Sequence, residues 1–179
     1  MILIGCDPGV TGAVSLFLGR SLIGVKDMPS DEIVTEAKGA SIRDLIGGPK
    51  EHKKHRLNPY RLAAVLREWS EGHSVILLRE DVHPRGGQGA VTSGTLMESV
   101  GLVDGICAAI GIQIEKVDPS VWKRAMGVND VKRMSCERAT KEFPMWRDMF
   151  KRVMDHNRAE AALLGLYGVR HLSQSIRFE

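Results

Sequence analysis

Short apolar runs alternate along the chain with longer stretches in which apolar residues recur every three or four positions. The short runs predict five strands, which lie at residues 1–6, 12–18, 22–26, 75–78 and 112–117. Turns at Gly9 and at Gly19-Arg20 separate the first three strands, which we therefore expect to form an antiparallel meander. The run 75–78 is apolar throughout, which is typical of a central strand covered on both faces.

The longer stretches predict helices. Asn58 followed by Pro59 is a typical helix start, and the helix it opens extends to about Ser70. The remaining helices are expected near residues 95–110, 121–126, 132–142 and 158–169. This order predicts an α/β fold in which one mixed five-stranded sheet has helices on both faces, and we expect residues 1–179 to form a single domain.

Three segments lack a regular pattern. Residues 29–58 contain several glycines and prolines and the basic run 50–56, so we expect a long surface insertion with a short helix near 41–46. The basic run can contact phosphates, although such runs are more often solvated loops. Residues 84–94 predict a Gly-rich loop, which is either a connector or a backbone contact for DNA. The tail 172–179 is expected to fray.

Composition narrows the class of protein. Hydrophobic residues make up 43% of the 179 positions and charged residues 26%, which is ordinary for a globular domain. No segment has the roughly 18 consecutive apolar residues of a membrane span, so we expect no membrane association. Three scattered cysteines predict no disulfide framework and favour a reducing, cytoplasmic location. The net charge of +3 is by itself weak support for nucleic-acid binding.

Four carboxylates carry the candidate chemistry. Asp7 and Glu80 follow predicted strands, and Asp155 and Glu160 flank the start of the last helix. Hard oxygen ligands without cysteine suit Mg²⁺ or Mn²⁺, and two such ions about 4 Å apart can support phosphodiester hydrolysis. Each residue alone also has a simpler explanation: Asp7 before Pro-Gly is a common turn former, and an aspartate favours a helix start.

Several motifs together resemble the RuvC family of the RNase H-like superfamily, especially its bacteriophage and prophage variants. The resemblance runs from IGCDPGVTGAVSLF to DHNRAEAALLGLYG and includes VILLREDVHPRGGQG and VDPSVWKRAMGV. It implies that Asp7, Glu80 and Glu160 are catalytic metal ligands. Many relatives have a second acid three residues before the last one, where this chain has Asn157. The fourth ligand is therefore Asp155 or Asn157, and we expect Asp155→Asn to raise the Mg²⁺ requirement more than Asn157→Ala.

The resemblance further implies a Holliday junction resolvase that binds four-way or branched DNA and needs no small-molecule cofactor. Lys123, Lys132 and Arg133 are the expected nucleic-acid contacts. Paired cuts at two-fold related positions require a C₂ homodimer, for which the apolar stripe of residues 95–110 is the candidate interface. That stripe equally fits a helix packed on its own sheet.

Three alternatives have the same motifs. An RNase H-like nuclease that cuts branched or fork DNA without strict junction selectivity would need the same site residues. An actin-like ATPase also opens with a strand, an aspartate and a Gly/Thr turn, but 179 residues leave no room for its second phosphate-binding domain. A DNA-binding module that has lost its metals would not need Asp7, Glu80 and Glu160.

Overall fold

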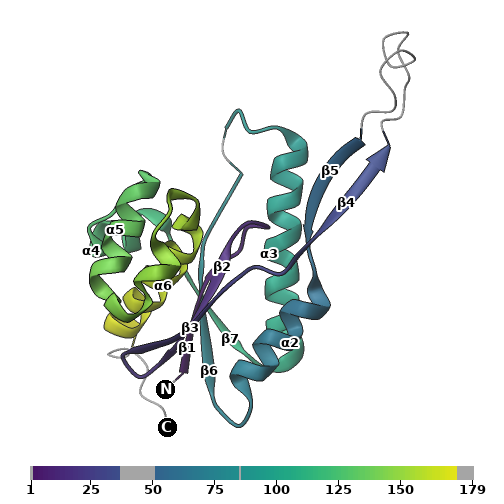
Figure 1. Ribbon diagram of the computed structural model, residues 1–179. Helices are drawn as coiled ribbons and strands as arrows, with labels where there is room; N and C mark the ends of the chain where they lie inside the picture. Colours follow the sequence, from purple (N-terminus) through teal and green to yellow (C-terminus); the bar gives the residue numbers. More distant parts are fainter. Residues whose placement is uncertain (1, 37–50, 85, 173–179) are drawn as a thin grey trace.

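The centre of the computed structural model, which describes residues 2–36, 51–84 and 86–172, is a five-stranded sheet. Its strand order is β3-β2-β1-β6-β7 (Figure 1). β1 pairs antiparallel with β2 and β2 with β3, whereas β6 is parallel to both β1 and β7. The strands are β1 Ile2–Asp7, β2 Ala13–Leu18, β3 Ser21–Asp27, β6 Val75–Glu80 and β7 Gln113–Val117. The expected antiparallel meander and the mixed five-stranded sheet are confirmed.

Helices cover both faces of this sheet, as the sequence predicts (Figure 1). On one face lie α2 (Pro59–Ser70) and α3 (Ala90–Ile110), and on the other lie α4 (Pro119–Met126), α5 (Lys132–Glu142) and α6 (His156–His171). Each face has its own apolar core. Successive side chains of a strand point to opposite faces, so Leu3 joins the α6 core while its neighbours Ile2 and Ile4 join the α2 and α3 core.

α6 packs on the sheet with almost no space between the backbones. A Cβ atom on Gly5 of β1 would lie 2.4 Å from the carbonyl oxygen of Ala161, and one on Gly165 would lie 2.5 Å from the ring of Phe17. The buried hydroxyl of Ser15 in β2 also donates a hydrogen bond of 2.7 Å to the carbonyl of Ala161. These contacts fix the distance between α6 and β1. They therefore also fix the positions of the α6 side chains that point to the end of β1.

The segment 29–58 differs from the expected irregular insertion. β4 (Ser30–Glu36) and β5 (Glu51–Leu57) pair antiparallel along their full length, in register from Ser30 with Leu57 to Glu36 with Glu51. The resulting two-stranded ribbon projects away from the rest of the molecule (Figure 1). β5 has charged side chains on both faces and therefore lacks the alternation of apolar and polar residues from which strands are predicted. The helix expected near 41–46 and the tail 173–179 lie outside the described residues.

Helix boundaries differ from the prediction mainly at α3. This helix begins at Ala90, inside the expected loop 84–94, with Gly89 as its N-cap residue and Gly94 inside its first turns. Two short 3₁₀ helices that the sequence did not predict, Pro144–Phe150 and Val153–Asp155, connect α5 to α6. All three cysteines are free and buried, in agreement with the absence of a disulfide framework.

α3 bears on the expectation of no membrane association. Its 21 residues are long and apolar enough to meet the length and composition criteria for a membrane span. The apolar core helix of a soluble protein meets the same criteria, so this single helix is weak support for a membrane location. Its buried residues are Ser99, Val100, Val103 and Cys107. Val103 and Cys107 belong to the apolar core between the sheet and the pair α2 and α3.

Candidate active site

Asp7 and Glu80 lie side by side at one end of the sheet. β1 and β6 are parallel neighbours whose register pairs Gly5 with Leu78 and Cys6 with Arg79. The next residues along the two strands are Asp7 and Glu80. Because side chains alternate between faces, both carboxylates point to the α6 side of the sheet, together with Leu3 and Leu78. Two strands thus bring together two carboxylates that are 73 residues apart in sequence.

Arg79, between Leu78 and Glu80, points to the opposite face. Its side chain is only 2% exposed and forms hydrogen bonds with both carboxylate oxygens of Asp104 in α3, at 2.9 and 3.1 Å. A third bond of 2.6 Å goes from Nη1 to the carbonyl oxygen of Glu80. This buried ion pair attaches the end of β6 to α3 and so fixes the backbone that carries Glu80. Sequence reasoning missed the pair, since nothing in the pattern links positions 79 and 104.

Glu160 approaches from α6, one turn inside the helix as expected. Ser135 of α5 donates a hydrogen bond of 3.1 Å to Oε1 of Glu160, and the Lys123 ammonium lies 3.4 Å from Oε2. The close packing of α6 on β1 places this carboxylate near Asp7 and Glu80. The structure therefore brings together three of the four acids that the sequence indicated.

The pKa values of Asp7 and Glu80 show how close these charges are. Burial and, after it, the negative charge of Glu160 raise the pKa of Asp7 to about 6, while the Gly9 amide and Lys123 oppose the rise. Burial, followed by the charges of Asp7 and Glu160, raises the pKa of Glu80 to about 7. Buried carboxylates that repel one another form a site whose charge is incompletely balanced.

Lys123 and Trp122 partly stabilise the negative charge of these carboxylates, one as a cation and the other as a hydrogen-bond donor. The Lys123 side chain is only 14% exposed and also pairs with Asp130 at 3.0 Å, so it belongs to the carboxylate group and does not lie on an open DNA-binding surface. Trp122 is fully buried in the α6 core, and its indole N–H donates a hydrogen bond of 2.7 Å to Oε1 of Glu80. Trp122 is therefore a core residue, and this burial keeps it from stacking on nucleic acid.

The donor chemistry of the group fits a hard divalent cation. Three carboxylates share one end of the sheet, and Lys123 supplies one positive charge against them. Oxygen donors of this kind are the ligands that Mg²⁺ and Mn²⁺ prefer. In residues 2–36, 51–84 and 86–172, no three His, Cys, Asp or Glu side chains are close enough together to hold a metal ion. The three carboxylates are neighbours, but their side chains are not close enough to one another to coordinate one metal ion.

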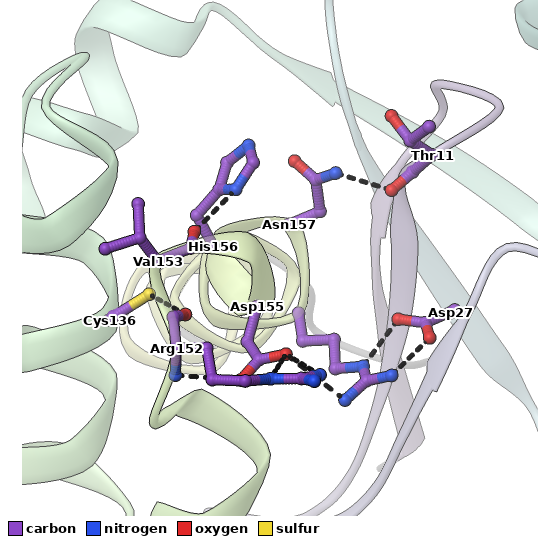
Figure 2. A network of polar contacts seen from close by, with 9 residues as sticks. Thr11, Asp27, Cys136, Arg152, Val153, Asp155, His156 and Asn157 are labelled. Carbon is purple, nitrogen blue, oxygen red and sulfur yellow. Dashed lines mark hydrogen bonds and ion pairs between the residues drawn. The ribbon is translucent and has the colours of Figure 1, made fainter.

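Asp155 lies in a different network (Figure 2). Both of its oxygens accept hydrogen bonds from the Arg152 side chain at 2.7 to 3.2 Å, and Oδ2 also accepts one from the Arg152 amide at 2.9 Å. Arg158, 3.7 Å away, connects it to Asp27 at the end of β3. Hydrogen bonds from Arg152 lower the pKa of Asp155. The structure thus gives Asp155 two arginines and does not bring it to Asp7, Glu80 and Glu160.

Asn157 points the other way, toward the turn that follows Asp7 (Figure 2). Its amide nitrogen donates a hydrogen bond to the carbonyl oxygen of Thr11. Asn157 and Glu160 are three residues apart and so share one face of α6. Asn157 therefore lies closer to the carboxylate group along the helix surface than Asp155 does.

Lys132 and Arg133 begin α5 and are exposed, as a nucleic-acid contact requires. Arg133 forms an ion pair of 3.0 Å with Glu137 one turn later. Lys132 lies three residues before Ser135, the partner of Glu160, and thus at the edge of the carboxylate group. The expectation that both residues contact DNA stays a prediction.

Comparison with known proteins identifies the fold. No protein-family model and no curated protein sequence matches the chain. Among solved structures, Thermus thermophilus RuvC in complex with a Holliday junction substrate aligns over 95% of this chain and 96% of that chain, with a TM-score of 0.54 and 13% identity. Another T. thermophilus RuvC structure aligns over the same shares, with a TM-score of 0.46 and 14% identity. The first likeness confirms the RuvC-like, RNase H-like α/β fold.

Proposed function

We propose that the protein is a Holliday junction resolvase, an endonuclease that hydrolyses phosphodiester bonds at four-way DNA junctions. The observation that carries the proposal is the meeting of Asp7, Glu80 and Glu160 at one end of the sheet, on a fold shared with a RuvC that was solved with a Holliday junction substrate. Fold alone does not imply function, so the carboxylate group is the essential part of the argument.

Asp7, Glu80 and Glu160 would hold the divalent ions, and Asn157 is the neighbouring amide that can add a neutral oxygen. Bound Mg²⁺ or Mn²⁺, two per site, would activate the attacking water and stabilise the leaving oxygen. The protein's own residues prepare this site: the Trp122 indole orients Glu80, Ser135 orients Glu160, and Arg79 with Asp104 fixes the end of β6. Lys123 offsets repulsion among the acids, and Lys132 and Arg133 are positioned to attract DNA phosphates.

The apolar stripe of α3 that the sequence offered as a dimer interface packs on its own sheet through Val103 and Cys107. The proposed interface of a C₂ homodimer is therefore the uncovered side of α3. Exposed small or apolar residues lie along one side of this helix, and they are Gly94, Met97, Gly101, Gly105 and Ala108. A Cβ atom on each of the three glycines would meet nothing within 4 Å. Such a surface allows two helices to approach closely in an isologous contact, which would provide the two active sites that paired cuts require.

Cleavage of defined DNA substrates tests the proposal. The protein is incubated with Mg²⁺ and a four-way junction, a fork or a linear duplex of matched sequence. We expect paired cuts in the junction, and none after Asp7→Asn or Glu80→Gln, while both variants keep their junction affinity. Equal cutting of junction and fork would favour the nuclease without strict junction selectivity. Parental activity in either variant would refute the proposed site.

A further inference from the structure

We propose that the β4–β5 ribbon is a second DNA-binding element, which lies in the major groove of a duplex arm and holds its phosphates through Lys53 and Lys54. The inference deepens the proposed function and rests on it in that DNA is the substrate. The ribbon contains none of the three carboxylates of the candidate site.

The ribbon is supported only at its base. Leu57 is buried in the core between the sheet and α2, whereas the described side chains from Asp31 to Val34 and from Lys53 to Arg56 are exposed on both faces. An isolated two-stranded hairpin is marginally stable in water. A ribbon with no apolar face against its own domain is therefore better suited to contact another molecule than to support the fold.

The base of the ribbon lies beside the turn that follows Asp7. His55 of β5 lines a hollow of about 320 Å³ together with Thr11 in the turn after Asp7, and with Asn157 and Arg158 at the start of α6. The register of the ribbon places Lys53 on the same face as His55, because the two are two residues apart. A nucleic acid that lies in this hollow would meet the ribbon next.

The basic residues of β5 favour DNA as the partner. The run Lys53-Lys54-His55-Arg56 lies on β5. The side chains of Lys53, His55 and Arg56 are 60%, 55% and 62% exposed. Glu32 lies 2.9 Å from Lys53 and 3.9 Å from His55, and so holds these two side chains next to one another. Lys54 points to the opposite face. A two-stranded ribbon fits the major groove of B-DNA, where side chains on its two faces can reach the two phosphate walls.

The direct test is the affinity of the full chain for a four-way junction with long arms, measured by fluorescence anisotropy without divalent metal. We expect Lys53→Ala/Lys54→Ala to weaken binding about tenfold at low salt and to reduce the slope of log K against log [salt] by about 2, because two phosphate contacts are lost. The matched control is Arg20→Ala/Arg67→Ala, which removes two exposed bases far from the ribbon and should leave both quantities unchanged.

Glu32→Gln separates DNA contact from a structural role. This variant breaks the same ion pair as Lys53→Ala, so a purely structural pair would make both variants bind more weakly. If the ribbon contacts phosphates, Glu32→Gln removes a repulsive charge and should strengthen binding several-fold. Opposite signs for the two variants support the proposal, and equal signs overturn it.

Two further results would also overturn it. One is parental affinity and salt slope in Lys53→Ala/Lys54→Ala. The other is a change in sedimentation of that variant at unchanged DNA affinity, which would identify a second copy of the chain as the partner. Failure of the proposed function looks different: the wild-type protein would bind junctions but not cut them, and the ribbon variants would still bind more weakly.

Discussion

The indole N–H of Trp122 donates a hydrogen bond of 2.7 Å to Oε1 of Glu80, inside the core between α6 and the sheet. This bond lowers the pKa of Glu80, which burial and then Asp7 raise to about 7. A tryptophan that looks like a simple core residue in the sequence therefore helps to keep the candidate ligand ionised.

Trp122→Phe should raise the pKa of Glu80 further, because it removes the hydrogen bond to the carboxylate but keeps an aromatic ring. The acid limb of the cleavage profile should then move to higher pH when Mg²⁺ is limiting. A carboxyl ¹³C NMR titration of the metal-free protein measures the shift directly. Trp146→Phe is the control, because Trp146 donates its N–H to the carbonyl of Leu22, away from the site. An identical Glu80 titration in both variants would contradict this role of Trp122.

Metal-free protein should lose stability as the pH rises from about 4 to about 7. Asp7 and Glu80 have raised pKa values, so the folded state binds more protons than the unfolded state between the ordinary values of 3.8 and 4.5 and the raised values of about 6 and about 7. Their favourable contribution is present below the unfolded pKa and disappears through the folded one. Urea unfolding across this range should show a decline that Asp7→Asn reduces and that saturating Mg²⁺ offsets. A flat wild-type profile would show that the pKa values of Asp7 and Glu80 are not raised in the folded state.

The packing of α6 against Phe17 should make Gly165 intolerant of a methyl group. Gly165→Ala places a Cβ atom 2.5 Å from that ring, so it should lower the free energy of unfolding by about 1–3 kcal/mol and shift Glu160 away from Asp7. Gly94→Ala is the matched control, since its Cβ would meet nothing within 4 Å and should stabilise α3 by about 0.5–1 kcal/mol. Chemical denaturation of both variants checks the difference, and equal effects would rule out the tight contact.

Gly105→Arg should convert the proposed dimer to a monomer without unfolding it, because the residue is exposed and has open space around its Cα. Sedimentation velocity measures the change, and junction cleavage should turn from paired cuts to single nicks. Ala64→Arg places the same side chain on the exposed side of α2 and should have no effect. A Gly105→Arg protein that remains dimeric would locate the interface elsewhere.

The sequence could predict the elements that depend on local pattern. Apolar runs located all five strands of the central sheet, and the positions of Asp7 and Glu80 just after two of them indicated a shared site. The parallel pairing that makes these two residues neighbours is a long-range contact, which no local pattern encodes. The pairing of Arg79 with Asp104 was missed for the same reason.

The surroundings of Asp155 and Lys123 were not predicted, although both had signals in the sequence. Asp155 has an arginine three residues before it and another three residues after it, a spacing that suits local ion pairs and argued against a metal ligand. Lys123 follows a tryptophan in a short helix that has one buried side. The aliphatic part of the Lys123 side chain lies along that side, and its ammonium reaches Glu160. The charged strand β5 gave no comparable signal, because its pairing with β4 depends on backbone hydrogen bonds and not on apolar alternation.

From the surroundings of Asp155 and Asn157 we predict the opposite order for the effects of their variants. Asp155 is saturated by Arg152 and Arg158, so Asp155→Asn should lower the free energy of unfolding by about 1–3 kcal/mol and leave the Mg²⁺ requirement of cleavage nearly unchanged. Because the pKa of Asp155 is lowered in the folded state, its contribution is present above the ordinary value of 3.8 and is lost as the pH falls below it. The stability difference between wild type and variant should therefore shrink in acid.

Asn157→Ala should show the opposite combination. It removes the hydrogen bond to Thr11 and the amide oxygen beside Glu160, so the turn after Asp7 loosens and cleavage should need several-fold more Mg²⁺ at little loss of stability. Urea unfolding and Mg²⁺ titration of both variants, with Glu160→Gln as the reference for a lost ligand, distinguish the two roles. An Asp155→Asn protein with wild-type stability and a larger Mg²⁺ requirement than Asn157→Ala would return the ligand role to Asp155, because arginines that only stabilise the fold cannot produce that result.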